Sequence, residues 1–224
     1  MRIEELVELL RVRGTRGLAV DIDETLSDSN RHWFDAMFAF ARPHGKSRDD
    51  IMRDHKFVED VPEWRTPEAR ARIHALLHSN EFCTDIPVIS GALEGAWRVH
   101  LMARIAAYIT ARPEAVRQGT LQWLKHRGFP EAPIIMRDED VDLSAHNDGK
   151  NGWKARMLSA AYPFILGIVD DNAGLTRALR AVNYAGTLFL YGPQWQPVNA
   201  SPSVILCPTW NDVSQAIHLR SCAW

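Results

Sequence analysis

Five short apolar runs, most of them ending in polar residues, constrain the fold of this chain more than any other feature. The runs cover residues 17–20, 105–110, 132–136, 164–169 and 187–190. Near-continuous apolar runs of this length are typical of strands that are buried on both faces, as in a parallel sheet. The sequence therefore predicts an α/β protein built on a parallel sheet.

Helical segments separate most of these runs. Such helices are expected at residues 3–10, 113–127, 153–161 and 175–182. The second of them has Pro113 at its first turn and Gly128 past its end, which are favoured positions for these residues. Alternating strands and helices imply right-handed crossovers and a doubly wound, Rossmann-like sheet. Ligands bind such sheets beyond the carboxyl ends of the strands.

Residues 28–86 interrupt this alternation. They contain no convincing strand, but helical patterns are clear at residues 32–40 and 68–78. We therefore predict a small helical cap at residues 28–86, inserted into a core domain formed by residues 1–27 and 87–224.

Polar residues at the ends of three runs form a candidate site. Asp21 and Asp23 follow the first run, and Thr110 closes the second. Asp170 and Asp171 follow the fourth run. Adjacent acids suit a hard divalent cation, and a hydroxyl followed by N–H groups at a helix start suits an anion. A turn or a helix cap would explain each feature alone, but their order together indicates one site.

A lysine between these elements would complete the site. Lys154 follows Trp153 and precedes Leu158 by four residues, which places it in the first turn of a helix with its stem over the core. Lys150 is the alternative, on an acidic stretch at residues 138–152 that is expected to be a long loop. The pattern favours Lys154.

The segments VDIDETLS, YITARPE and GIVDDN, with a lysine between the last two, resemble the four motifs of the haloacid dehalogenase-like (HAD) superfamily. The resemblance covers residues 17–28 and 91–192. It implies a HAD-like Rossmann fold, and residues 28–86 lie where many members carry a helical cap. The segments ISGALEGA and TLQWLKHRGFP are more weakly similar to nucleotidase-like and acid-phosphatase-like members.

The resemblance also implies catalytic roles. Asp21 would attack phosphorus and form an aspartyl-phosphate, while Asp23 would protonate the leaving oxygen and then activate water. Thr110 and the N–H of Ala111 would hold the phosphoryl oxygens, and the lysine, Lys154 or Lys150, would neutralise their charge.

The same resemblance implies a Mg²⁺ cofactor. Asp21, Asp170 and the backbone carbonyl of Asp23 would be ligands, with Asp171 binding directly or through water. Arg112, one residue past Ala111, is expected near the substrate.

The expected function is a Mg²⁺-dependent phosphatase that hydrolyses a small phosphomonoester. Members that cleave carbon–halogen bonds resemble the chain less, because they need no proton donor such as Asp23. A nucleotidase or a polynucleotide-end phosphatase would keep the same residues and is the alternative. An intact Asp23 counts against a noncatalytic binding or regulatory member. A phosphoacceptor receiver domain is disfavoured, since there the acidic pair precedes the phosphorylated aspartate.

Composition limits the partners. Lysines and arginines number 26 against 28 acids, for a formal charge of −2. This charge disfavours nucleic acid and anionic membranes, unless residues 28–86 concentrate the basic groups. No apolar run approaches the roughly 20 residues of a membrane span, and three cysteines are too few for a disulfide framework. We expect a cytoplasmic protein. The oligomeric state is not specified by the sequence.

Overall fold

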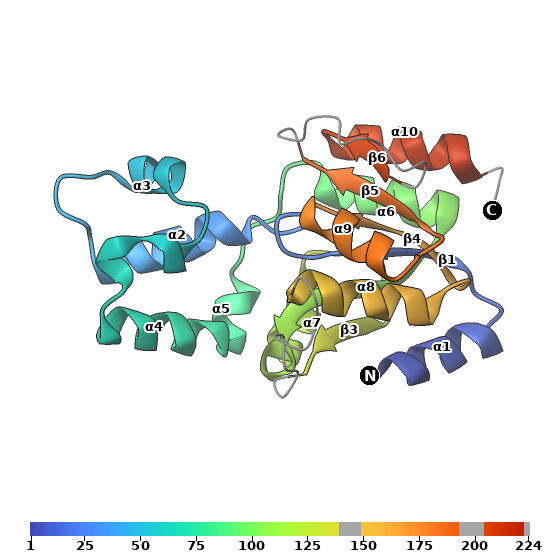
Figure 1. Cartoon of the computed structure of the whole chain (residues 1–224), viewed down its shortest axis with the longest axis horizontal. Helices are drawn as coiled ribbons and strands as arrows, with labels where there is room; N and C mark the ends of the chain where they lie inside the picture. Colours follow the sequence, from blue (N-terminus) through green and yellow to red (C-terminus); the bar gives the residue numbers. More distant parts are fainter. Residues whose placement is uncertain (139–148, 193–203, 222–224) are drawn as a thin grey trace.

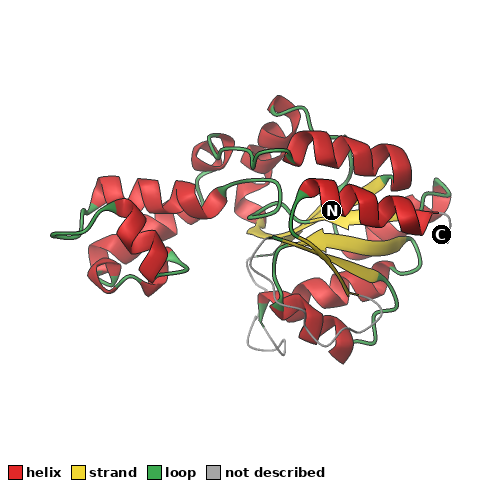
Figure 2. Ribbon diagram, turned by 90° about the horizontal axis from the view of Figure 1, so that it is seen from above, coloured by secondary structure: helices red, strands yellow, loops and turns green. Residues whose placement is uncertain are grey.

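A single six-stranded parallel sheet organises the chain (Figures 1 and 2). The computed structural model describes residues 1–138, 149–192 and 204–221. The strands are β1 (Gly17–Val20), β2 (Ile105–Pro113), β3 (Ile134–Arg137), β4 (Ile165–Asp170), β5 (Thr187–Tyr191) and β6 (Val204–Cys207). Their order is β3-β2-β1-β4-β5-β6. The predicted Rossmann-like α/β fold is confirmed, and β6 is a strand that the sequence pattern did not indicate.

Helices cover both faces of the sheet (Figure 2). Leu18 and Val20 of β1 pack on one face with α6 (Ala92–Ala103), α7 (Arg117–His126) and α10 (Trp210–Ser221). Ala19 points to the other face, toward α1 (Ile3–Val12), α8 (Lys150–Ala161) and α9 (Gly174–Ala181). Because both faces are buried, the strands are apolar at successive positions. Among the described residues, no helix combines the length and apolar character needed to cross a membrane.

The predicted helix at residues 113–127 begins later than expected. β2 continues through Pro113, which pairs with Arg137 and has an extended backbone with φ −68° and ψ 152°. A short 3₁₀ turn, η3 (Glu114–Val116), then leads into α7. The prediction was wrong here because the φ that proline imposes suits an extended segment as well as a first helical turn.

The lysine-bearing helix, in contrast, begins earlier than expected. α8 starts at Lys150, so the last part of the predicted loop is helical. Most of the remaining loop, residues 139–148, lies outside the described residues. The sequence also gave no indication of α6 or α10.

Short helices fill the chain between β1 and α6. They are α2 (Ser29–Phe40), α3 (Arg48–Asp54), η1 (Val58–Asp60), η2 (Pro62–Trp64), α4 (Pro67–Leu77) and α5 (Asn80–Thr84). α2, α3 and α4 stand away from the sheet in both views (Figures 1 and 2). They have an apolar cluster of their own, in which the buried Trp64 donates to the carbonyl of Ala41 at 2.7 Å.

α5 is attached to the sheet-side core. Its Cys83 belongs to the apolar cluster around the sheet, and the side chain of Asn80 accepts a 2.6 Å hydrogen bond from Gly119 N on α7. A Cβ on Gly119 would lie 2.3 Å from the carbonyl oxygen of Asn80, so only glycine allows this approach. The segment at residues 29–84 therefore packs partly on itself and partly on the core.

Candidate active site

The carboxyl ends of β1 and β4 bring two candidate residues to one edge of the sheet. Val20 pairs with Val169 of β4 and with Tyr108 of β2. The next residues, Asp21 and Asp170, therefore lie at the same level. β1 is also where the strand order reverses, which is the usual ligand position in doubly wound sheets.

Three acids crowd together at this edge. Carboxylate oxygens of Asp21, Asp170 and Asp171 all lie within 4.8 Å of one another, and Asp21 and Asp170 are buried. Burial raises the pKa of Asp21 to about 7 and that of Asp171 to about 8, and the charge of Asp170 adds to both shifts. Asp21 Oδ1 is buried without a hydrogen-bond partner. Crowded oxygen donors, one of them unpartnered, fit a Mg²⁺ ion.

Lys154 is the cation that faces these acids. Its Nζ lies 2.6 Å from Asp170 Oδ2 and 3.0 Å from Asp21 Oδ2. Its side chain is buried, and the two carboxylates raise its pKa despite the opposing effect of burial. It is the fifth residue of α8, one turn later than predicted. Lys150 begins α8 and is exposed. The structure thus brings Lys154, and not Lys150, to the acids.

Asp23 is held by an arginine rather than by this cluster. Arg112 Nη2 donates to Asp23 Oδ1 at 2.6 Å, and Nε lies 3.0 Å from Oδ1 and 3.1 Å from Oδ2. Partial burial raises the pKa of Asp23, but Arg112 outweighs it and holds that pKa below its usual value. At neutral pH, Asp23 is therefore a carboxylate at rest.

Arg112, which is expected near the substrate, forms its closest contacts with Asp23. Its Nε and Nη2 donors are directed at Asp23 and at Ser27 Oγ, and Nη1 lies 3.4 Å from Thr120 Oγ1. Only 6% of its side chain is exposed. The sequence contains no signal for the Asp23–Arg112 pair, because its members are 89 residues apart.

Thr110 is buried, and its Oγ1 accepts a 3.3 Å hydrogen bond from Arg112 N. Ala111 belongs to β2, so the expected helix start after Thr110 is not found. β2 is irregular here, because three of its residues lie between the pairs Ile109–Ile135 and Pro113–Arg137 where β3 has one. Such bulges redirect side chains next to functional sites.

Glu24 is a residue of this site that sequence reasoning missed. It has a positive φ of 55°, which is rare for a residue other than glycine. Its Oε1 accepts hydrogen bonds from Ser29 Oγ at 2.9 Å and Asn30 N at 2.6 Å, at the start of α2. The loop that carries Asp23 is thereby tied to the first helix of the insertion.

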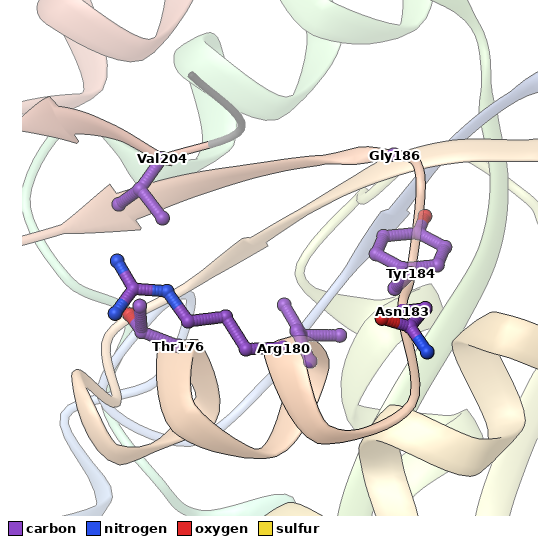
Figure 3. A pocket seen from close by; sticks show the side chains of 7 residues that line it. Thr176, Arg180, Asn183, Tyr184, Gly186 and Val204 are labelled. Atoms are coloured by element: carbon purple, nitrogen blue, oxygen red, sulfur yellow. The ribbon is translucent and has the colours of Figure 1, made fainter. Parts of the chain in front are cut away.

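A cavity of about 430 Å³ lies elsewhere, between α9 and strands β5 and β6 (Figure 3). It is lined by Thr176, Leu179, Arg180, Asn183, Tyr184, Gly186 and Val204. Gly186 precedes β5 and Val204 begins β6, so the cavity reaches the amino ends of these strands. None of the acids at the opposite edge contributes to its lining.

No protein-family model matches the sequence, and no curated protein matches it. Among solved structures, the fold is similar to a HAD hydrolase of family IA, variant 3, from Entamoeba histolytica. That match has a TM-score of 0.57 and 13% identity, and it covers 94% of this chain and all of that one. An L-2-haloacid dehalogenase matches with a TM-score of 0.52 and 14% identity over 92% of this chain and 100% of the other.

These structural matches show that the protein has the HAD-like fold, as predicted. The first name states a hydrolase without a substrate, and the second states a dehalogenase. The shared fold therefore does not specify which bond this chain cleaves.

Proposed function

We propose that this protein is a Mg²⁺-dependent phosphatase that hydrolyses a small phosphomonoester through an aspartyl-phosphate on Asp21. The observation that carries the proposal is the buried contact of Lys154 Nζ with Asp21 and Asp170, at 3.0 and 2.6 Å. An ammonium fixed beside a carboxylate nucleophile is suited to a reaction in which an anionic group is attacked.

Asp21, Asp170 and Asp171 would hold the Mg²⁺ ion, together with the backbone carbonyl of Asp23. When bound, the ion supplies positive charge that offsets the repulsion between the Asp21 carboxylate and a phosphate dianion. Thr110 and the N–H of Ala111 are proposed to hold phosphoryl oxygens.

The first step forms a bond between an Asp21 carboxylate oxygen and phosphorus, while the bond from phosphorus to the leaving oxygen breaks. Asp23 gives its proton to that leaving oxygen. Water then attacks phosphorus and gives a proton to Asp23, and the bond between Asp21 and phosphorus breaks. Inorganic phosphate leaves, and Asp23 is protonated again. Because Asp23 is a carboxylate at rest, it takes up a proton from the buffered solvent before the first turnover.

Asp23 favours phosphate over carbon–halogen chemistry. A halide leaves as a stable anion and needs no proton, whereas an alkoxide leaving group does. A carboxyl group two residues after the nucleophile, with 37% of its side chain exposed, is available for this transfer.

The test measures phosphate release from p-nitrophenyl phosphate and halide release from an L-2-haloacid, each with Mg²⁺ and with EDTA. We expect Mg²⁺-dependent phosphate release that Asp21→Asn abolishes. Asp49→Asn, at an exposed acid of α3, is the matched control and should keep the wild-type rate. Halide release without phosphate release would contradict the proposal, as would an Asp21→Asn variant with near-native turnover.

A further inference from the structure

Arg112 binds the two oxygens of Asp23 unequally. Oδ1 accepts hydrogen bonds from Arg112 Nη2 at 2.6 Å and from Nε at 3.0 Å, and Ser27 Oγ lies 3.3 Å from the same oxygen. Oδ2 lies 3.1 Å from the shared Nε, and the Ser29 hydroxyl also hydrogen-bonds to this carboxylate. Arg112 therefore directs Nη2 and Nε at Oδ1 and the shared Nε at Oδ2, so that Oδ2 keeps more of its capacity to carry or accept a proton.

The guanidinium is itself fixed by the core. Besides Asp23, it contacts Ser27 Oγ at 3.1 Å and Thr120 Oγ1 at 3.4 Å. It lies over the Trp123 ring at 5.9 Å, and Trp123 is anchored by a 2.7 Å hydrogen bond to the carbonyl of Ile86. A planar guanidinium held at its edge and its face has one orientation, which it imposes on its carboxylate partner.

We propose that Arg112 is the positioning residue of Asp23: it fastens the Oδ1 edge of this carboxylate to the core and leaves Oδ2 as the oxygen that transfers the proton. The inference rests on the proposed function, because it assigns Asp23 a proton-transfer role. It removes Arg112 from direct contact with the substrate. Its effect on the reaction has to pass through Asp23.

This dependence gives the inference a quantitative test. General acid–base catalysis is worth about 10²- to 10⁴-fold in rate, and a misplaced carboxyl group loses much of it. We expect Arg112→Gln to lower kcat by about 10²-fold for a phosphomonoester with an alkoxide leaving group, such as glycerol 2-phosphate, and to change KM by less than about threefold. In the background of Asp23→Asn, the same substitution should change kcat by less than about threefold.

Arg117→Gln is the matched control. Arg117 forms a two-pronged pair with Glu114 on the same side of the core, through its Nε and Nη2, and contacts none of the site residues described above. It should keep the wild-type kcat in both backgrounds. Arg112→Ala offers a second readout, since added guanidinium ion should restore part of its kcat without lowering KM.

The outcomes separate the inference from the proposed function. Wild-type protein without phosphate release overturns the proposed function, and the inference with it. Wild-type turnover combined with an equal loss for Arg112→Gln in both backgrounds overturns the inference alone, as does a loss confined to KM. If Arg112→Gln does not fold, Arg112→Lys keeps the charge without the planar fork and should show the same dependence on Asp23. An Arg112→Lys variant with wild-type kcat overturns the inference.

Discussion

Replacing Lys154 by methionine should destabilise the protein in a way that depends on pH. The substitution keeps the unbranched stem but removes the ammonium that lies 2.6 Å from Asp170 and 3.0 Å from Asp21. At an effective dielectric constant of about 20, a charge pair at 2.6 Å is worth about 6 kcal/mol before desolvation is counted. Desolvation of the buried ammonium offsets several kcal/mol of this attraction. Removing one partner of such a buried pair typically lowers the free energy of unfolding by about 3–5 kcal/mol.

The pH dependence follows from the pKa values of the acids. Burial raises the pKa of Asp21 to about 7 and that of Asp171 to about 8, above their values in the unfolded chain. A carboxyl group with a raised pKa in the folded state favours folding at low pH, and this contribution is lost as pH rises through the folded pKa. At pH 6 both carboxyl groups are mostly protonated and neutral, so the ammonium of Lys154 stabilises them less than it stabilises two carboxylates. The cost of Lys154→Met should therefore be larger at pH 8.5 than at pH 6.

The assay is urea unfolding without added metal at both pH values, beside Lys150→Met as the matched control. We expect a loss of about 3–5 kcal/mol at pH 8.5 for Lys154→Met, or a drop in Tm of about 6–20 °C. Lys150 is exposed, so its substitution should change the free energy of unfolding by less than about 0.5 kcal/mol. Equal stabilities of the two variants at pH 8.5, or a loss that is the same at both pH values, would refute the reasoning.

Two further predictions concern the acidic cluster and the packing of α10. Mg²⁺ should raise the Tm of the wild-type protein more at pH 8.5 than at pH 6. The ion competes with the protons on Asp21 and Asp171, whose pKa values are raised to about 7 and about 8. Equal Tm shifts in a thermal scan at both pH values would count against metal binding by these groups. Gly95→Ala on α6 should lower the free energy of unfolding by about 1–3 kcal/mol, because the added Cβ would lie 2.5 Å from the Trp210 ring of α10. Chemical denaturation measures this loss. Gly45→Ala is compared in the same assay, because a Cβ there meets no neighbour but φ is +73°, so that its effect reports backbone strain without crowding.

Local patterns account for most of the sheet and for part of the site. Each apolar run overlaps a strand, because runs this short that end in polar residues fit strands buried on both faces better than longer buried helices. The pattern around Lys154 predicted that its stem lies over the core, and its side chain is buried, because nearby residues set which side of α8 faces inward. Pro113 was misjudged, since its preferred φ does not distinguish a strand end from a helix start.

Contacts between distant segments could not be predicted in the same way. The pairing of Arg112 with Asp23 depends on the bulge in β2 and on the loop after β1, and neither is encoded by a periodic pattern. α10 was missed for a related reason. Its Trp210 packs against α6 and donates to the carbonyl of Thr25, 185 residues away, so tertiary contacts define its buried face.

Glu24 restricts how the insertion can move. Its carboxylate holds the first residues of α2, and its backbone adjoins Asp23. The two segments that connect the insertion to the core are also hydrogen-bonded to each other. Asp28 N donates to the carbonyl of Pro87, and Ile89 N donates to that of Leu26, both at 2.9 Å. A displacement of α2 relative to the sheet must either break the Glu24 hydrogen bonds or move the loop that carries Asp23 and Glu24 along with the helix. In the second case the loop would have to move against the hydrogen bonds by which Arg112 holds the Asp23 carboxylate, so both sets of hydrogen bonds resist such a movement.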